Sequence, residues 1–356
     1  MRLFMLLKEL VKKNLIKKQV PGFLVDNTHY LALMGSVAYG CSEDYSDMDI
    51  YGWCIPPKEY VFPHTAGYIA GFGKQPPNFE NWQEHHIQDD QKKREYDISI
   101  YGIIKYFQLI TENNPNMIDS LFVPINCVLH ASESAQMLRE NRHLFLHKGC
   151  WHKFKGYAFS QLNKCKTIDG EPVIAELVAF EEIHNLPHSA GLAANINLLT
   201  KYGANANDIL RYNELYAKAS TEKKRAINTK IFGYDVKFAY HVVRLIDEAA
   251  EILYDHDLTL DKYSRREMLK SIRRGEWKFE EIQSYFRQKE ADLDKLYRES
   301  TLRHSPDEDA IKKLLLNILE SHYGNIENAI ANIAEKDMID NFKAINAIIE
   351  PYKKYF

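Results

Sequence analysis

Cysteine is scarce in this sequence, and no pair of cysteines has the spacing of a zinc ribbon or a disulfide framework. The five that occur are widely scattered: Cys41, Cys54, Cys127, Cys150 and Cys165. Free cysteines of this kind suit a reducing compartment, so we expect a cytoplasmic protein. A marked excess of either charge is also lacking. The net charge of -3 excludes a globally basic nucleic-acid binder, although it does not exclude a local basic groove.

Long apolar runs are absent as well. No stretch approaches the roughly 20 apolar residues of a membrane-spanning helix, so no membrane is expected as a partner. Residues 1–18 are apolar at intervals but interrupted by charge, which predicts an amphipathic helix and argues against a signal peptide. What remains is a chain of 356 residues, 45% hydrophobic and 27% charged, which is typical of a globular protein with one large domain or two.

Apolar patterning predicts strands early in the chain and helices later. Strands are predicted at 29–34, 48–55 and 96–100, and a short helix is predicted at 36–41. Residues 63–95 are rich in Pro, Gly, Asn, Gln and charge, which indicates a long loop or a β-excursion. From residue 103 onward apolar residues recur at intervals of three and four, the spacing of helices.

We therefore expect an α+β fold of two domains. A small α/β head with a mixed sheet would occupy residues 1–125 and include the N-terminal helix and a loop insertion at 63–95. A large all-helical domain would follow at 126–356.

Two aspartates at alternate positions of the second strand suggest chemistry. Asp47 and Asp49 point to the same face, where their charges repel each other unless a cation lies between them. Gly35 allows the backbone to approach a phosphate closely, and Ser36 with the free N–H groups of the next helix can bind a triphosphate. This pattern predicts two divalent ions about 3.5–4 Å apart, held by the aspartates.

A third carboxylate would complete the second metal site and act as general base. Asp97 is our candidate, because it lies on a short predicted strand. Asp89 and Asp90 are weaker candidates, since no strand is predicted around them. The pair His85-His86 could suggest a metal site with these two acids, but consecutive histidines in a charged loop are usually only exposed.

Residues 34–52 resemble the signature of the DNA polymerase β nucleotidyltransferase superfamily, in which Gly-Ser is followed by Asp-x-Asp and a third strand aspartate. Further segments are similar to the RNA-repair-associated nucleotidyltransferases of bacteria and phages: those at 97–122, 151–162, 234–245 and 274–276. One departure is Asp119, where that family often has Glu. The resemblance implies a polymerase-β-type head and Mg²⁺-dependent nucleotidyl transfer, with RNA ends as the inferred acceptor.

Two predicted helices carry residues that could bind the nucleotide. Lys153, Tyr157, Gln161 and Lys164 share one stripe, and Lys237, His241 and Arg244 share another. The alternatives are a solvated stripe for the first helix and ion pairs with neighbouring helices for the second. With the resemblance, our nucleotide-binding candidates are Gly35, Ser36, Ser46, Lys155, Tyr157, Gln161, Lys237, His241 and Arg244.

A third helix is rich in basic residues and has few acids between them. It supplies the best candidates for contact with nucleic-acid phosphates, although a plain solvated face is as good an interpretation. Together with the lysines of the first helix, the acceptor candidates are Lys153, Lys164, Arg266, Lys270, Arg273 and Arg274.

These features predict an enzyme that uses two Mg²⁺ or Mn²⁺ ions. It would transfer NMP from a nucleoside triphosphate to a hydroxyl group, with release of pyrophosphate, and RNA such as a tRNA end is the favoured acceptor. One alternative acceptor is a protein side chain, as in antitoxin-type AMP transferases. A small molecule is another, and an inactive RNA-binding protein is a further alternative. The sequence carries no signal for an oligomeric state.

Overall fold

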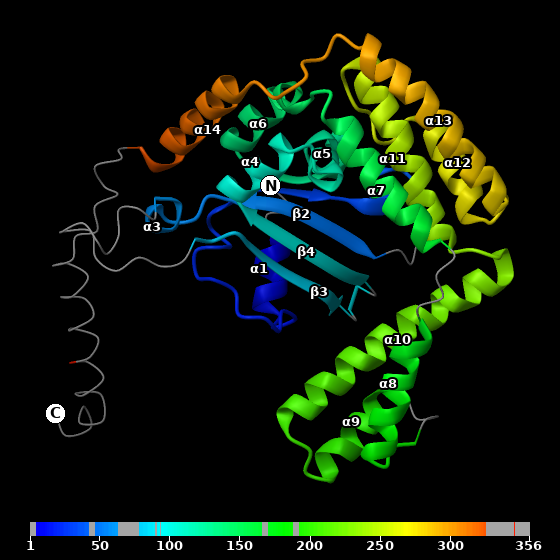
Figure 1. Ribbon diagram of the computed structural model, residues 1–356. Coiled ribbons are helices and arrows are strands. Elements are labelled where there is room, and N and C mark those ends of the chain that lie inside the picture. The colour runs from blue at the N-terminus through cyan, green and yellow to red at the C-terminus, as the bar shows by residue number, and fades with distance from the viewer. Residues whose placement is uncertain are drawn as a thin grey trace. The chain divides into compact units, whose positions relative to one another are not determined.

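The computed structural model describes residues 5–42, 47–62, 78–89, 91–92, 94–165, 170–187, 192–324 and 345. The chain forms two compact units (Figure 1). We call residues 1–150, 251–262 and 300–356 the head unit, and residues 151–250 and 263–299 the helical unit. This division differs from the predicted boundary after residue 125, because later segments of the chain return to the head.

The head unit contains a five-stranded sheet in the order β3-β4-β2-β1-β5. Its strands are β1 (Thr28–Leu33), β2 (Met48–Cys54), β3 (Asn81–Asp89), β4 (Arg94–Gly102) and β5 (Val128–Ala131). Strands β2 and β4 are parallel and the other neighbours are antiparallel. The sheet is therefore mixed, which confirms the predicted α+β fold with a large helical part.

Two strands lie where none was firmly predicted. Strand β3 occupies part of the predicted loop insertion, so the β-excursion is the correct interpretation there; residues 63–77 of that insertion lie outside the described part. Strand β5 interrupts the region predicted to be all-helical, and it joins the head because it pairs with β1. Its four residues are too few to show an alternating pattern.

The two faces of the sheet are covered by different helices. Helix α1 (Met5–Lys12) packs its leucines against one face, where Ile50, Ile98 and Ile100 form the core (Figure 1). On the other face, Trp53 of β2 contacts Tyr106 with ring centroids 6.1 Å apart. The remaining head helices are α2 (Gly35–Ala38), α3 (Lys58–Val61), α4 (Ile103–Thr111), α5 (Pro115–Phe122), α6 (Glu133–Glu140) and α14 (Glu308–Tyr323).

The helical unit consists of helices and contains a core cluster of its own. They are α7 (Cys150–Lys164), α8 (Gly170–Ile183), α9 (Leu192–Lys201), α10 (Ala206–Phe232), α11 (Val236–Asp255), α12 (Tyr263–Arg273) and α13 (Phe279–Glu299), of which α7 and α11 have an end in the head. Leu177, Leu199 and Tyr212 belong to a cluster that unites α8, α9 and α10. Among the residues described, no helix has the length and apolar character needed to cross a bilayer.

Candidate active site

The parallel pairing of β2 with β4 brings two predicted catalytic aspartates side by side. Asp49 and Asp97 are register partners, so both side chains emerge on the same face of the sheet. Asp47 precedes β2 and is exposed, two residues before Asp49. The opposite face at this level is apolar, with Ile50 and Ile98 in the core against α1. The sheet thus sorts acids to one face and apolar side chains to the other.

Gly35 is required at the first position of α2 because the Asp49 carboxylate occupies the space beside it. Its φ is +59°, and a Cβ atom there would lie 2.2 Å from Oδ2 of Asp49. The neighbouring Met34 N–H donates to the Asp49 carbonyl oxygen at 2.8 Å, which fixes this turn against β2. Ser36 follows within α2. The predicted nucleotide contact Ser46 lies outside the described residues.

A buried hydrogen bond anchors the end of α2 to the rest of the head. The hydroxyl of Tyr39, the residue that closes α2, donates to Asp119 Oδ2 at 2.6 Å. Asp119 is fully buried in α5. This residue, at which the sequence departs from the family pattern, therefore positions the Gly35-Ser36 turn from a distance.

Strand β3 carries an irregularity opposite Asp97. Glu84 pairs with Ile98 and Ile87 pairs with Tyr96, so two residues, His85 and His86, oppose the single residue Asp97. This is a β-bulge, and His86 adopts a left-handed conformation with φ +57°. Its backbone N–H donates to Asp97 Oδ1 at 2.7 Å. The His85 Nδ1 atom lies 3.6 Å from the same oxygen.

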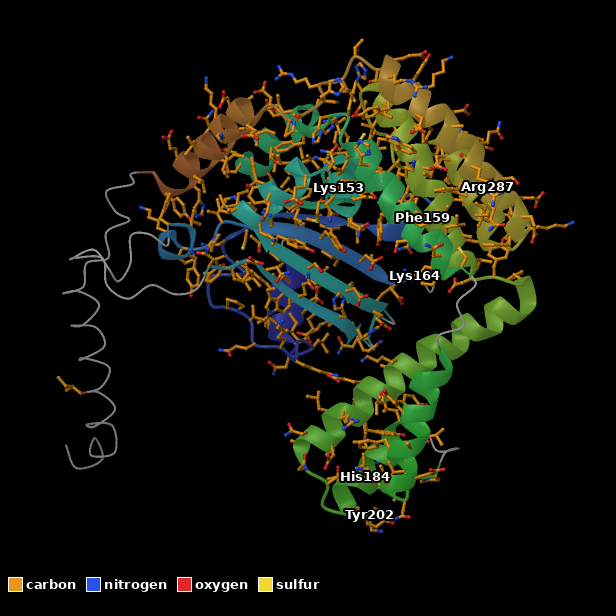
Figure 2. The ribbon with its side chains drawn as sticks, viewed as in Figure 1. Lys153, Phe159, Lys164, His184, Tyr202 and Arg287 are labelled. Carbon is orange, nitrogen blue, oxygen red and sulfur yellow. The ribbon has the colours of Figure 1, made fainter. Side chains whose placement is uncertain are left out.

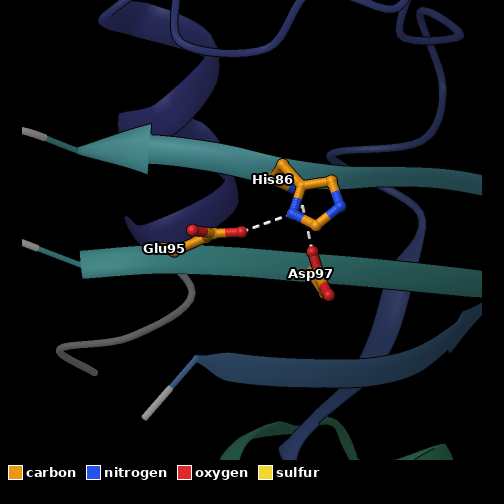
Figure 3. Close-up of side chains that lie close together, drawn as sticks. All are labelled: His86, Glu95 and Asp97. Atoms are coloured by element: carbon orange, nitrogen blue, oxygen red, sulfur yellow. Dashed lines mark hydrogen bonds and ion pairs between the residues drawn. The ribbon is translucent and has the colours of Figure 1, made fainter. Parts of the chain in front are cut away.

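The bulge also joins His86 to a fourth carboxylate. The Nδ1 atom of His86 makes a short hydrogen bond with Glu95, which lies two residues before Asp97 on the same face of β4 (Figure 3). That hydrogen bond raises the pKa of the His86 imidazole above its usual value, and the charges of Asp97, Glu95 and Asp47 raise it further, against the opposing effect of desolvation. The head therefore gathers four acids and two histidines.

The weaker candidates for the third carboxylate differ in placement from Asp97. Asp89 lies two residues after Ile87, whose side chain packs in the core against α1. It is buried, and its Oδ2 is 3.3 Å from Lys13 Nζ. Asp90 lies outside the described residues. The placement of Asp89 gives it a structural ion pair on the other face of the sheet.

The acid face suits a divalent metal ion. Carboxylate oxygens are the donors that Mg²⁺ and Mn²⁺ prefer, and Asp49 and Asp97 supply two carboxylates from one level of two adjacent strands, with Asp47 two residues before Asp49. The absence of a side chain at Gly35 leaves room for the Asp49 carboxylate beside the turn. Asp47, Asp49 and Asp97 remain the residues that the sequence predicts to hold the ions.

Helix α7 does not present the predicted stripe as one exposed face. Lys153 and Lys164 are exposed (Figure 2), and 38% of Tyr157 is accessible. Gln161 is only 5% accessible, because the stripe drifts around the helix toward the interior. The helix therefore offers two lysines and a tyrosine to solvent, and the predicted contact of Gln161 with a nucleotide gains no support from its placement.

Two of the predicted nucleotide-binding cations are paired with acids inside the helical unit. Arg244 is 1% accessible and its Nη1 lies 2.9 Å from Glu248 Oε2. Lys155 lies 2.6 Å from Glu290 Oε1 and over the Trp151 ring. These pairs favour the alternative in which the cations have structural partners.

Helix α11 exposes one of its remaining candidates and half-buries the other. Lys237 is exposed and His241 is half-buried, with its ring 5.0 Å from that of Tyr240. The guanidinium of Arg273, on α12, lies 5.8 Å from the same tyrosine ring. Tyr240 thus brings a histidine and an arginine from two helices together.

The other basic residues of this region have acidic neighbours close in sequence. Arg266 and Lys270 each lie 3.6 Å from Glu267. Arg274 makes two hydrogen bonds with Glu276, at 2.5 and 3.0 Å, which raise the pKa of its guanidinium. Much of the positive charge that was predicted to contact the acceptor is therefore compensated locally.

A groove between α7 and α13 was not singled out by the sequence. It has a volume of about 420 Å³, and its lining includes Phe159, Asn163, Gln283, Phe286 and Arg287. Phe159 is 53% exposed (Figure 2), and its ring centroid is 6.4 Å from that of Phe286. Aromatic rings, two amides and an arginine in one groove are groups that can bind an unpaired nucleotide.

Comparison with known families identifies the chain. The family model RlaP, described as the RNA repair pathway DNA polymerase beta family, matches residues 7–260, which include the three aspartates and well over half of the chain. Comparisons with curated proteins and with solved structures gave no significant match. The match confirms the resemblance seen in the sequence. The chain belongs to the RNA repair pathway DNA polymerase beta family.

Proposed function

We propose that this protein transfers a nucleoside monophosphate from a nucleoside triphosphate to a hydroxyl group of RNA. The family supports nucleotidyl transfer in an RNA repair pathway. The observation that carries the proposal is the register of β2 and β4, which aligns Asp49 with Asp97 on one face, beside a glycine that can have no side chain. Like charges are brought together in this way at sites that bind cations.

The reaction would proceed by in-line displacement at the α-phosphorus. The acceptor oxygen forms a bond to that phosphorus, the bond to the β-phosphate oxygen breaks, and pyrophosphate leaves. Asp97 is the candidate general base for the hydroxyl proton, and the His86 N–H holds its Oδ1 in place. Divalent ions bound by the aspartates would neutralise phosphate charge and lower the pKa of the attacking hydroxyl.

The triphosphate would bind at the turn into α2. Gly35 allows close approach of a phosphate to the backbone, and Ser36 supplies a hydroxyl and an N–H group there. Among the helical candidates, Tyr157 and Lys237 have the exposure that binding needs. His241 is half-buried, and Lys155 could exchange Glu290 for a phosphate.

RNA is favoured as the acceptor by the family and by the surface of the helical unit. The α7–α13 groove offers Phe159 for stacking on a base and Arg287 for a phosphate. Lys153 and Lys164 lie exposed on the same helix as Phe159. Protein and small-molecule acceptors remain the alternatives. They can be distinguished from RNA by finding which molecule carries the transferred nucleotide.

The test is incubation with each α-labelled NTP, Mg²⁺ or Mn²⁺, and either total RNA or total protein. We expect label to enter RNA with the unmodified chain and not with Asp47→Asn/Asp49→Asn. Asp26→Asn is a matched control, because Asp26 is an exposed carboxylate of the head that pairs with Lys8. Label in protein and not in RNA would show that the acceptor is a protein side chain. Tight RNA binding without incorporation of any label would contradict transfer.

A further inference from the structure

The β-bulge creates a cluster of possible metal ligands that the three aspartates alone do not explain. One ligand atom from each of His86, Glu95 and Asp97 can be chosen so that all lie within 4.8 Å of one another (Figure 3). Ligands of a tetrahedral ion bonded at about 2.1 Å are separated by about 3.4 Å, so small rotations of these side chains close the site. All three are at least partly accessible to solvent.

Two separate features of the backbone place these groups: strand alternation places Glu95 and Asp97, and the bulge places His86. Glu95 and Asp97 alternate along β4 and so share a face. His86 joins them only because the bulge gives β3 an extra residue at this level, which turns its side chain toward β4. Left-handed backbone at a non-glycine residue is strained, and such positions concentrate at functional sites.

Hydrogen bonds already orient the two carboxylates. Gln88 Nε2 donates to Glu95 Oε2 at 2.5 Å, and the His86 N–H donates to Asp97 Oδ1 at 2.7 Å. Glu95 therefore has Oε2 held by Gln88 and Oε1 by His86 Nδ1, a hydrogen bond that a metal ion would replace, and Asp97 has Oδ1 held by the backbone. Outer hydrogen bonds of this kind fix metal ligands in productive orientations.

We propose that His86, Glu95 and Asp97 form a binding site for a divalent transition-metal ion such as Mn²⁺, Co²⁺ or Zn²⁺. An imidazole nitrogen with two carboxylates favours these ions over Mg²⁺, which prefers oxygen ligands alone. The site is distinct from one formed by the three aspartates, because two of its three ligands are not aspartates. It shares Asp97 with them but does not depend on the proposed nucleotidyl transfer.

The test isolates this site from the neighbouring acids. Full-length Asp47→Asn/Asp49→Asn protein serves as the parent, so that ions held by those aspartates do not contribute. Co²⁺ is titrated in millimolar Mg²⁺, and binding is followed by its visible absorption and by calorimetry. We expect one Co²⁺ per chain that Mg²⁺ does not displace. Adding His86→Asn or Glu95→Gln should weaken Co²⁺ binding at least about tenfold.

The substitutions are chosen to leave the fold intact. Asparagine tolerates the positive φ of residue 86, and glutamine keeps the size of Glu95. His85→Asn is the matched control, because it removes the adjacent imidazole, which is outside the cluster. It should change Co²⁺ affinity less than threefold, by about 0.6 kcal/mol or less. Unchanged circular dichroism verifies folding of each variant.

Three results would overturn the assignment. The first is displacement of Co²⁺ by millimolar Mg²⁺, and the second is undiminished Co²⁺ affinity in both His86→Asn and Glu95→Gln. The third is loss of Co²⁺ binding in His85→Asn with binding retained in His86→Asn. A chain that binds Co²⁺ as expected, yet whose unmodified form transfers no nucleotide, would support this site and contradict the proposed function, so the two failures are distinguishable.

Discussion

The head unit and the helical unit arrange charge in opposite ways. In the head, strand register brings Asp49 beside Asp97, and Glu95, two residues before Asp97, lies on the same face. In the helical unit, cations are matched with acids, as in the buried pair Arg244–Glu248. Clustered like charges lower the stability of a metal-free fold, whereas pairs of opposite charge satisfy each other. A cluster of like charge is therefore the stronger sign of a ligand site.

Exposed pairs in the helical unit extend the same contrast. Arg274 holds Glu276 through two hydrogen bonds, and Lys270 lies near Glu267. Such exposed pairs contribute little to stability and are easily exchanged for other partners. A basic residue in this unit is thus a weaker functional candidate than an acid in the head, and substitutions in the two units should have different effects.

The largest effect should come from Asp49→Asn. We expect kcat/KM for nucleotidyl transfer to fall at least about 10³-fold, which corresponds to about 4 kcal/mol of transition-state stabilisation. The same substitution removes a repelling charge next to Asp97, so the thermal unfolding midpoint of the metal-free protein should rise. Transfer assays and calorimetry on one preparation measure both. Transfer within tenfold of the unmodified chain would contradict the assignment of Asp49.

The next effect should come from Arg244→Ala, and it should be confined to stability. Removing the guanidinium leaves Glu248 buried without this partner, which typically costs about 3–5 kcal/mol of unfolding free energy. Urea denaturation measures the loss. The control is Arg244→Met/Glu248→Leu, which removes both charges and should recover most of the stability. A large loss of NTP affinity in a stable Arg244→Ala protein would restore the nucleotide-binding prediction.

The sequence predicted the elements of the head better than the surface of the helical unit. The strand around Asp49, the Gly35 turn and the strand around Asp97 follow from local alternation and from turn chemistry, both of which are visible within a few residues. The bulge also left a signal. Trp82 and Ile87 share the core face although they are five positions apart, an odd number that a regular strand does not allow.

Burial on the helices depends on neighbours that the sequence does not identify. Helical spacing places Gln161 in line with Lys153, but it does not tell which part of the stripe other helices cover. Arg244 is different, because Glu248 lies four residues later on the same helix and the pairing could have been inferred. The groove beside Phe159 depends on residues more than a hundred positions away, in α13.

A smaller effect on transfer should come from Gly35→Ala. A Cβ at this position would overlap Asp49 Oδ2, so the carboxylate must shift, and we expect transfer to fall about 10²-fold, or about 2.7 kcal/mol. Gly324→Ala is the matched control: its φ is +66° and a Cβ there meets nothing within 4 Å. Both substitutions strain the backbone by about 1–2 kcal/mol. Equal transfer activities in the two variants would contradict the role of Gly35.

The smallest effects should appear in RNA affinity, where substitutions of two residues of the helical unit can be compared. Phe159→Ala removes an exposed ring from the α7–α13 groove and should weaken binding of single-stranded RNA about fivefold, or about 1 kcal/mol, the low end for loss of one stacked base. Arg274→Ala should change the affinity less than twofold, because Glu276 already compensates that charge. Fluorescence anisotropy at two salt concentrations measures both. The reverse order of effects would mean that phosphate attraction, rather than stacking in this groove, holds the RNA.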